Sequence, residues 1–150
     1  RAHVRASGTS GSGVPNAPET PHRLLAPVAE AGIEIDMIVL ASNEDGTADF
    51  AFTVHRSDYD QAIGLTRRGA ACWPAARVEG TDRVAKMSIV GVGMRSHAGV
   101  AAKLFAALAQ AGIGVRLVST SEIRISVLLA ESQLERAVRE THEAFSLSGH

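Results

Sequence analysis

The segment LAQAGIGVRLVS (Leu108–Ser119) repeats VAEAGIEIDMIV (Val28–Val39) at a constant offset of 80 residues, and this repeat decides the fold. In each copy a stripe of apolar residues at helical spacing ends at an Ala-Gly pair. An alternating apolar pattern, typical of a β-strand, follows the glycine. The chain therefore contains a helix, a glycine stop and a strand twice in the same order, and we predict two modules of one plan.

Around the first copy, apolar periodicity predicts the order strand, helix, strand, strand, helix. The expected elements are a strand over His3–Ser7, a helix over Arg23–Ala31, strands over Ile33–Val39 and Phe50–Val54, and a helix over Asp58–Arg68. The Gly-, Ser- and Pro-rich stretch Ser7–His22 is a loop or a disordered arm. Ser57, followed three residues later by Asp60, resembles a helix cap. Cys72–Val78 is an edge strand or a connection, because Pro74 cannot donate a hydrogen bond to a central ladder.

The second copy predicts the same order of elements. The expected elements are a strand over Lys86–Val92, a helix over Val100–Ala111, strands over Ile113–Leu117 and Ile123–Leu129, and a helix over Ser132–Phe145. If a fourth strand closes each copy, the fold is α+β, with two ferredoxin-like (βαββαβ) modules whose antiparallel sheets carry helices on one face. The predicted division is 1–22 as a strand and flexible Gly-Ser-Pro-rich segment of the first module, 23–82 as the first module and 83–150 as the second. Open sheet edges and faces predict pairing of modules or dimerisation.

The composition excludes several classes of function. The net charge is −1, without a basic block, and aromatic residues make up 4% of the chain, so neither nucleic acid nor an anionic membrane is an expected partner. No apolar run reaches the length of a membrane span. The single cysteine, Cys72, cannot form an internal disulfide and suits a reducing cytoplasm.

Motifs of enzymatic chemistry are missing from the sequence. GVGMRS (Gly91–Ser96) lacks the third glycine of a dinucleotide fingerprint, and no phosphate loop or nucleophile elbow occurs. The six histidines lack the close spacing of zinc ligands. We therefore expect no catalytic residue, no metal and no cofactor, and we expect this chain alone not to be an enzyme.

Two loops remain as candidate sites for a small molecule. GMRSHAGV (Gly93–Val100) leads into a helix, whose free N–H groups favour a carboxylate, although Ser96 or His97 could simply cap that helix. The polar segment Ser119–Glu122 is either an ordinary hairpin turn or a group of hydroxyls and one carboxylate that holds an ammonium or hydroxyl group. In a ferredoxin-like module these two loops lie at neighbouring ends of strands, and a zwitterion needs both kinds of partner.

The sequence KMSIVGVGMRSHAGVAAKLFAALAQAGIGVRLVSTSEIRISVLL (Lys86–Leu129) closely resembles the second ACT domain of bacterial aspartate kinases. AEAGIEIDMIV (Ala29–Val39) and EDGTADFAFTV (Glu44–Val54) resemble the matching parts of the first ACT domain, so the resemblance covers about Arg23–Leu147. It implies a regulatory region that binds lysine or threonine and gives allosteric feedback control of aspartate-family amino acid biosynthesis. It also implies a homodimer through the ACT modules and a kinase catalytic domain or subunit as partner.

The resemblance also implies the residues that contact the effector. Carried onto this chain, they are Met94, Ser96, His97, Gly99, Gly114, Val115, Thr120, Ser121 and Glu122. A half-site in the first module would involve Asp36, Ile38, Leu40 and Ala41.

Three departures from the family pattern motivate an alternative. Leu40 and Ala41 replace a Gln-Asn pair, the segment Ser7–His22 replaces a short Pro-Gly loop, and Arg116 stands where the family has an acidic residue. A cation at Arg116 repels lysine if the side chain contacts an effector's amine, but alternation with the neighbouring apolar residues favours a side chain that points to solvent, where the change means little. Without the two amides, an effector's polar groups would lack partners in that half-site, at a cost of about 1–3 kcal/mol. The alternative is therefore a diverged ACT scaffold for dimerisation or assembly that no longer binds an effector.

Overall fold

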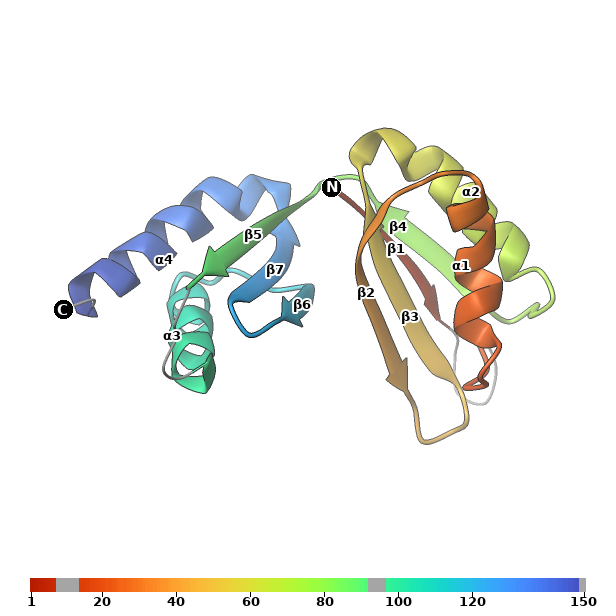
Figure 1. Cartoon of the computed structure of the whole chain (residues 1–150), viewed down its shortest axis with the longest axis horizontal. Helices are drawn as coiled ribbons and strands as arrows, with labels where there is room; N and C mark the ends of the chain where they lie inside the picture. The colour runs from red at the N-terminus through yellow and green to blue at the C-terminus, as the bar shows by residue number, and fades with distance from the viewer. Residues whose placement is uncertain (8–13, 92–96, 149–150) are drawn as a thin grey trace. The chain divides into compact units, whose positions relative to one another are not determined.

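The computed structural model describes residues 1–7, 14–91 and 97–148. They form two units, Arg1–Asp82 and Arg83–His150 (Figure 1). Each unit combines one antiparallel sheet with two α-helices, which confirms the predicted α+β class. None of the helices in the described residues has the length and apolar character of a membrane span.

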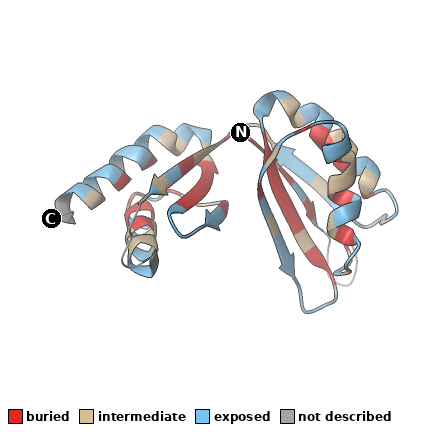
Figure 2. Ribbon diagram, in the orientation of Figure 1, coloured by how far each residue is buried: buried red, intermediate tan, exposed pale blue. Residues whose placement is uncertain are grey.

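The first unit has a four-stranded sheet with both helices on one face (Figure 1). Its elements are β1 (Ala2–Ser7), α1 (Thr20–Glu30), β2 (Ile35–Ser42), β3 (Ala48–Val54), α2 (Tyr59–Gly69) and β4 (Arg77–Thr81). The strand order is β2-β3-β1-β4, with every neighbouring pair antiparallel. Phe50 and Phe52 of β3 are buried in the core, where Leu24 and Val28 of α1 meet them, so the predicted apolar stripe and the predicted alternation face each other (Figure 2).

The start of α1 differs from the prediction. The helix begins at Thr20, three residues earlier than expected, and Pro21 fits its first turn because no N–H is needed there. The hydroxyl of Thr20 donates to the Pro15 carbonyl at 2.8 Å. Val14 is fully buried, and its carbonyl accepts a bond of 2.8 Å from the N–H of Ala48. The described part of the Gly-Ser-Pro-rich stretch is therefore a loop fixed against the β2–β3 hairpin.

The predicted cap of the second helix is wrong. A 3₁₀ turn, Arg56–Asp58, leads into α2 and contains Ser57. Asp58 is the N-cap residue, and it makes no side-chain capping bond. The 3₁₀ turn continues the chain directly from β3 into α2, so the helix starts without the Ser57–Asp60 arrangement.

The second unit has three described strands and two helices. Its elements are β5 (Val84–Val90), α3 (His97–Gln110), β6 (Leu117–Thr120), β7 (Arg124–Ala130) and α4 (Leu134–Ser148). The strand order is β5-β7-β6, antiparallel throughout. The fourth strand expected from the repeat is not among the described residues of this unit. Its core joins Leu104 and Leu108 of α3 to Ile125 and Val127 of β7.

The repeated glycine ends a helix in both units. Gly32 and Gly112 have φ angles of 76° and 71°, a left-handed conformation that glycine adopts without strain. The N–H of the following residue, Ile33 or Ile113, bonds back to the carbonyl of Val28 or Leu108. This is the bonding of a Schellman motif, and it turns the chain from helix toward strand in both copies.

Two threonines at matching helix positions are expected to respond oppositely when each is replaced by valine. Thr66 and Thr141 are each the eighth residue of their helix, α2 and α4, and both are buried. The Thr66 hydroxyl donates to the Ala62 carbonyl at 2.9 Å, whereas the Thr141 hydroxyl has no hydrogen-bond partner among the residues that the structure describes. Because a buried hydroxyl without a partner costs about 1–3 kcal/mol, Thr141→Val is expected to stabilise the second unit by about 1 kcal/mol. Urea unfolding followed by hydrogen exchange in each unit measures this change.

Thr66→Val is the matched control for that prediction. It removes the same atom from the same helix position but breaks a hydrogen bond, so it is expected to leave the first unit unchanged or less stable. Equal destabilisation by both substitutions would show that the Thr141 hydroxyl is satisfied in solution.

Candidate functional site

The polar segment Ser119–Glu122 lies at the tip of the β6–β7 hairpin. Ser119 and Thr120 end β6, and Ser121 and Glu122 form the turn into β7. The Ser121 N–H bonds to the Arg124 carbonyl at 2.8 Å, which closes the turn. All four side chains are exposed, so the backbone of the turn is satisfied while its hydroxyls and carboxylate face solvent.

The loop that leads into α3 starts beside this hairpin. Val90, the last residue of β5, pairs with Arg124 of β7. The next residue, Gly91, donates its N–H to the Ile123 carbonyl at 2.9 Å. Gly91, two residues before the first candidate loop, therefore lies beside Ile123 in the turn that carries the second.

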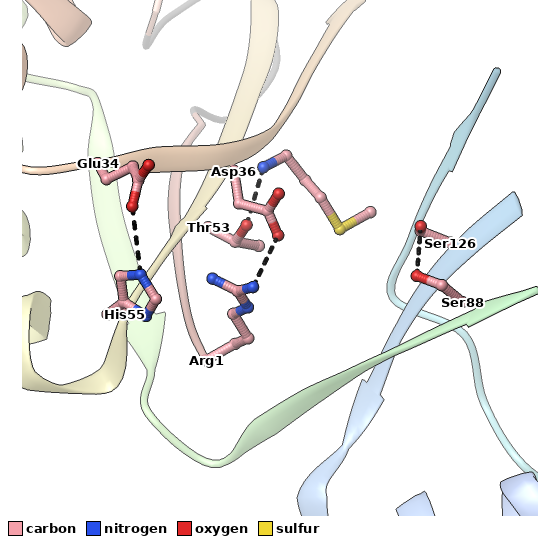
Figure 3. A network of polar contacts seen from close by, with 8 residues as sticks. Arg1, Glu34, Asp36, Thr53, His55, Ser88 and Ser126 are labelled. Carbon is pink, nitrogen blue, oxygen red and sulfur yellow. Dashed lines mark hydrogen bonds and ion pairs between the residues drawn. The ribbon is translucent and has the colours of Figure 1, made fainter. Parts of the chain in front are cut away.

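A row of serine hydroxyls crosses the sheet of the second unit. Ser88 of β5 lies opposite Ser126 of β7, and Ser126 lies opposite Ser119 of β6. The Ser88 and Ser126 Oγ atoms are 2.7 Å apart (Figure 3). Their neighbours Met87 and Val127 belong to the core under the helices, so the serines face away from α3 and α4.

The sequence alone did not predict this row, because Ser88 and Ser126 are 38 residues apart in the chain. A serine inside a strongly apolar, alternating strand was the available signal for each of them. Only the pairing of β5 with β7 shows that the two hydroxyls meet.

The remaining predicted residues of the second unit fall in three places. His97 is the first residue of α3 and Gly99 lies in its first turn, with its backbone exposed. Gly114 and Val115 belong to the link between α3 and β6, where Gly114 is exposed and Val115 packs against the core. Met94 and Ser96 lie outside the described residues.

The candidate half-site of the first unit lies along β2, an edge strand. Ile38 and Leu40 have 53% and 46% of their surface exposed, and Ala41 is also exposed. Asp36 pairs with Arg1, with Oδ2 and Nη2 3.5 Å apart (Figure 3). These residues of β2 present apolar side chains and one ion-paired carboxylate. Leu40 and Ala41 have no side-chain amide that could orient a ligand.

Charge at the hairpin of the second unit is mixed. Glu122 is an exposed carboxylate, while Arg116 and Arg124 are exposed cations at either side of the polar segment. The Arg116 N–H donates to the Leu128 carbonyl at 2.7 Å, which anchors the backbone of Arg116 to β7. Hydroxyls and a carboxylate suit an ammonium group, and cations suit a carboxylate, so the site can hold a zwitterion. No group of three or more His, Cys, Asp or Glu residues that could hold a metal ion occurs in the described parts of the chain.

Comparison with known proteins gives one consistent result. A model of the ACT domain family matches residues 87–145. Aspartate kinase of Pseudomonas fluorescens is 50% identical over 135 residues, which are 90% of this chain and 33% of that protein. Aspartokinase of Corynebacterium efficiens is 41% identical over 139 residues, 91% of this chain and 33% of that protein. The chain thus spans about a third of the length of the curated relatives it matches.

Two solved structures align with this chain over nearly their whole length. A structure of aspartokinase α and β subunits aligns with a TM-score of 0.85 and 44% identity, covering 97% of this chain and 92% of that chain. The ligand-free regulatory subunit of aspartate kinase from Thermus thermophilus aligns with a TM-score of 0.85 and 32% identity, covering 96% and 91%.

Proposed function

The chain belongs to the aspartate kinase family, in which it is an ACT regulatory region, and on this basis we propose that it binds an amino-acid effector at the β6–β7 hairpin of its second unit. One observation carries the proposal. The hydrogen bond from Gly91 to Ile123 holds the end of β5, from which the chain continues toward α3, against the hairpin that bears Thr120, Ser121 and Glu122. Glu122 and the hydroxyls receive the effector's ammonium group, and its carboxylate is received by the loop that precedes α3.

Regulation follows if the effector favours one arrangement of the protein over another. A ligand shifts such an equilibrium only by the difference in its affinity for the two states. In this proposal the region acts on a kinase catalytic domain or subunit that phosphorylates aspartate, as a homodimer through the ACT modules and in the cytoplasm. Feedback control of aspartate-family amino acid biosynthesis is the physiological role.

Lysine and threonine are the proposed effectors, and Arg116 is expected to make their affinities differ. Arg116 is exposed and directly precedes β6, the strand that leads into the polar segment, and its positive charge is unfavourable for a second ammonium group on the ligand. We therefore expect threonine to bind more tightly than lysine, and Arg116→Glu to reverse or reduce this preference. Isothermal titration of the wild-type chain and the Arg116→Glu variant with lysine, threonine, methionine and glycine measures it.

The same titration addresses the alternative, a scaffold that no longer binds an effector. The apolar, amide-free strip on β2 of the first unit is the observation that favours the alternative. A melting temperature that no amino acid changes, together with a dimer that is stable on dilution, would support the scaffold and contradict effector binding.

A further inference from the structure

A cavity of about 360 Å³ lies in the first unit, at the loop that joins α2 to β4 (Figure 1). It is lined by Arg67 of α2, by Trp73, Pro74 and three alanines at the end of α2 and in the loop, and by Val78 of β4. Its volume lies within the range of about 300–1,000 Å³ that is typical of ligand sites. The proposed effector site lies in the second unit, so this cavity has no part in it.

Backbone hydrogen bonds hold this loop in two successive turns. The Trp73 N–H donates to the Ala70 carbonyl at 2.9 Å, and the Trp73 carbonyl accepts a bond of 2.9 Å from the Ala76 N–H. The Ala71 N–H donates to the Arg68 carbonyl at 3.2 Å. The indole of Trp73 packs in part against the core of the first unit and stays partly exposed. The loop therefore presents the indole in one fixed position, which lowers the entropy lost when a partner binds.

Three arginines lie near the indole. Arg67 and Arg68 are exposed residues in the last turn of α2. The guanidinium of Arg23, on α1, lies 5.9 Å from the centre of the Trp73 ring. The two helices come close together here, since a Cβ atom at Gly69 would lie 2.8 Å from the Arg23 carbonyl oxygen. Among the described residues no acidic side chain lines the cavity, so the surroundings of the indole are positive although the net charge of the chain is −1.

The backbone of the loop does not suit a phosphate ion. Phosphate sites use backbone N–H groups that are free at a turn or at the start of a helix. Here the N–H groups of Ala71, Trp73 and Ala76 donate to carbonyls of the same segment, and Pro74 has no N–H. Anion binding therefore depends on the guanidinium groups, and a free phosphate would gain nothing from the apolar wall. A carboxylate attached to an apolar chain would use both parts of the cavity.

We propose that this surface binds an acidic peptide segment of a partner protein. An apolar side chain of the segment packs against Trp73 and Pro74, and a neighbouring carboxylate pairs with Arg67. Tryptophan and arginine are the residue types that most often dominate the affinity of protein–protein contacts. By excluding water, the apolar side chain strengthens the ion pair beside it. Further carboxylates of the segment meet Arg23 and Arg68.

The test uses the full 150-residue chain and the fluorescence of Trp73, the only tryptophan in the sequence. The probe is the end-capped peptide Glu-Glu-Leu-Glu-Glu. A saturable shift of the tryptophan emission to shorter wavelength is expected, because the leucine side chain removes water from the indole. The peptide Glu-Glu-Ser-Glu-Glu keeps the charge without the apolar side chain, and it should bind about fivefold more weakly or worse.

Arg67→Glu should weaken binding of the leucine peptide about tenfold or more, because a carboxylate replaces the guanidinium that pairs with the peptide. Arg67 is exposed, so the substitution should leave the fold intact. Arg139→Glu is the matched control, since Arg139 is an exposed arginine of α4 in the second unit. It makes the same change of charge and should alter the affinity less than about twofold. Glu122→Lys should leave peptide binding unchanged, so failure of the effector proposal does not affect this one.

Several results would overturn the proposal. One is the absence of a saturable shift, and another is equal weakening by Arg67→Glu and Arg139→Glu, which would show that only the overall charge matters. An equal shift with inorganic phosphate or a nucleoside triphosphate would identify a site for small anions instead. A Trp73 emission that shifts with the concentration of the chain alone would show that a second copy, rather than an acidic peptide, covers the indole.

Discussion

Replacing Glu122 with lysine is expected to raise the dissociation constant of the amino-acid effector by about 10- to 100-fold. In the proposed site, the Glu122 carboxylate accepts a charge-assisted hydrogen bond from the effector's ammonium group, and such bonds contribute about 1.5–3 kcal/mol. Lysine removes that acceptor and adds a repulsive charge. Glu122 is exposed at the hairpin tip, so the substitution should leave the fold intact. Isothermal titration with the effector measures the change.

Glu143→Lys provides the control for charge. Glu143 is an exposed residue of α4, and its replacement changes the net charge of the chain by the same amount. An effect confined to Glu122→Lys locates the effector at the hairpin. If both variants weaken binding equally, only the overall charge matters and the hairpin is not the site.

Replacing Phe52 with alanine is expected to lower the free energy of unfolding of the first unit by about 3–5 kcal/mol. Phe52 is fully buried in the middle of β3, between β1 and β2, and its ring lies 6.1 Å from the ring of Phe50. Alanine leaves a cavity that the surrounding strands can close only in part. Urea unfolding combined with hydrogen exchange of β3 amides measures the loss.

The two cores of the chain provide the control for this prediction. The core that contains Phe52 and the core that contains Ile125 share no residue. The amides of β7 are therefore expected to keep their protection in Phe52→Ala, while those of β3 lose it. Phe52→Leu, which conserves most of the volume, should cost less than about 1.5 kcal/mol. Equal loss of protection in β3 and β7 would show that both units unfold together.

Much of the fold could be predicted because it depends on local periodicity. The repeated Ala-Gly stop ends α1 and α3, and alternation identifies β3 and β7, whose inward residues Phe52 and Val127 are buried. The burial of Val14 against the β2–β3 hairpin could not be predicted, since the hydrogen bond from Ala48 to Val14 joins residues far apart in the chain. The sequence of the Gly- and Pro-rich stretch does not identify Ala48 as the partner of Val14.

In the candidate site, too, local features could be predicted and contacts between distant residues could not. The hairpin Ser119–Glu122 and its neighbouring loop were predicted from local pattern and from resemblance, and their role in effector binding stays a proposal. The contact between Ser88 and Ser126 required the register of β5 on β7, because a strand's own alternation does not identify its partner.

By itself, the sequence determined that the chain holds two copies of one plan, that a glycine stops the first helix of each copy, and which residues of β3 and β7 face the core. The predicted strand Ile113–Leu117 is wrong, because β6 begins only at Leu117. Only the tertiary structure decided how far residues at matching positions of the two copies are buried. Ile63 and Val138 occupy the same helix position, yet one is buried and the other is exposed. The physical reason is that burial depends on the neighbour across the sheet, which β4 provides in the first unit, and not on the periodicity of the helix itself.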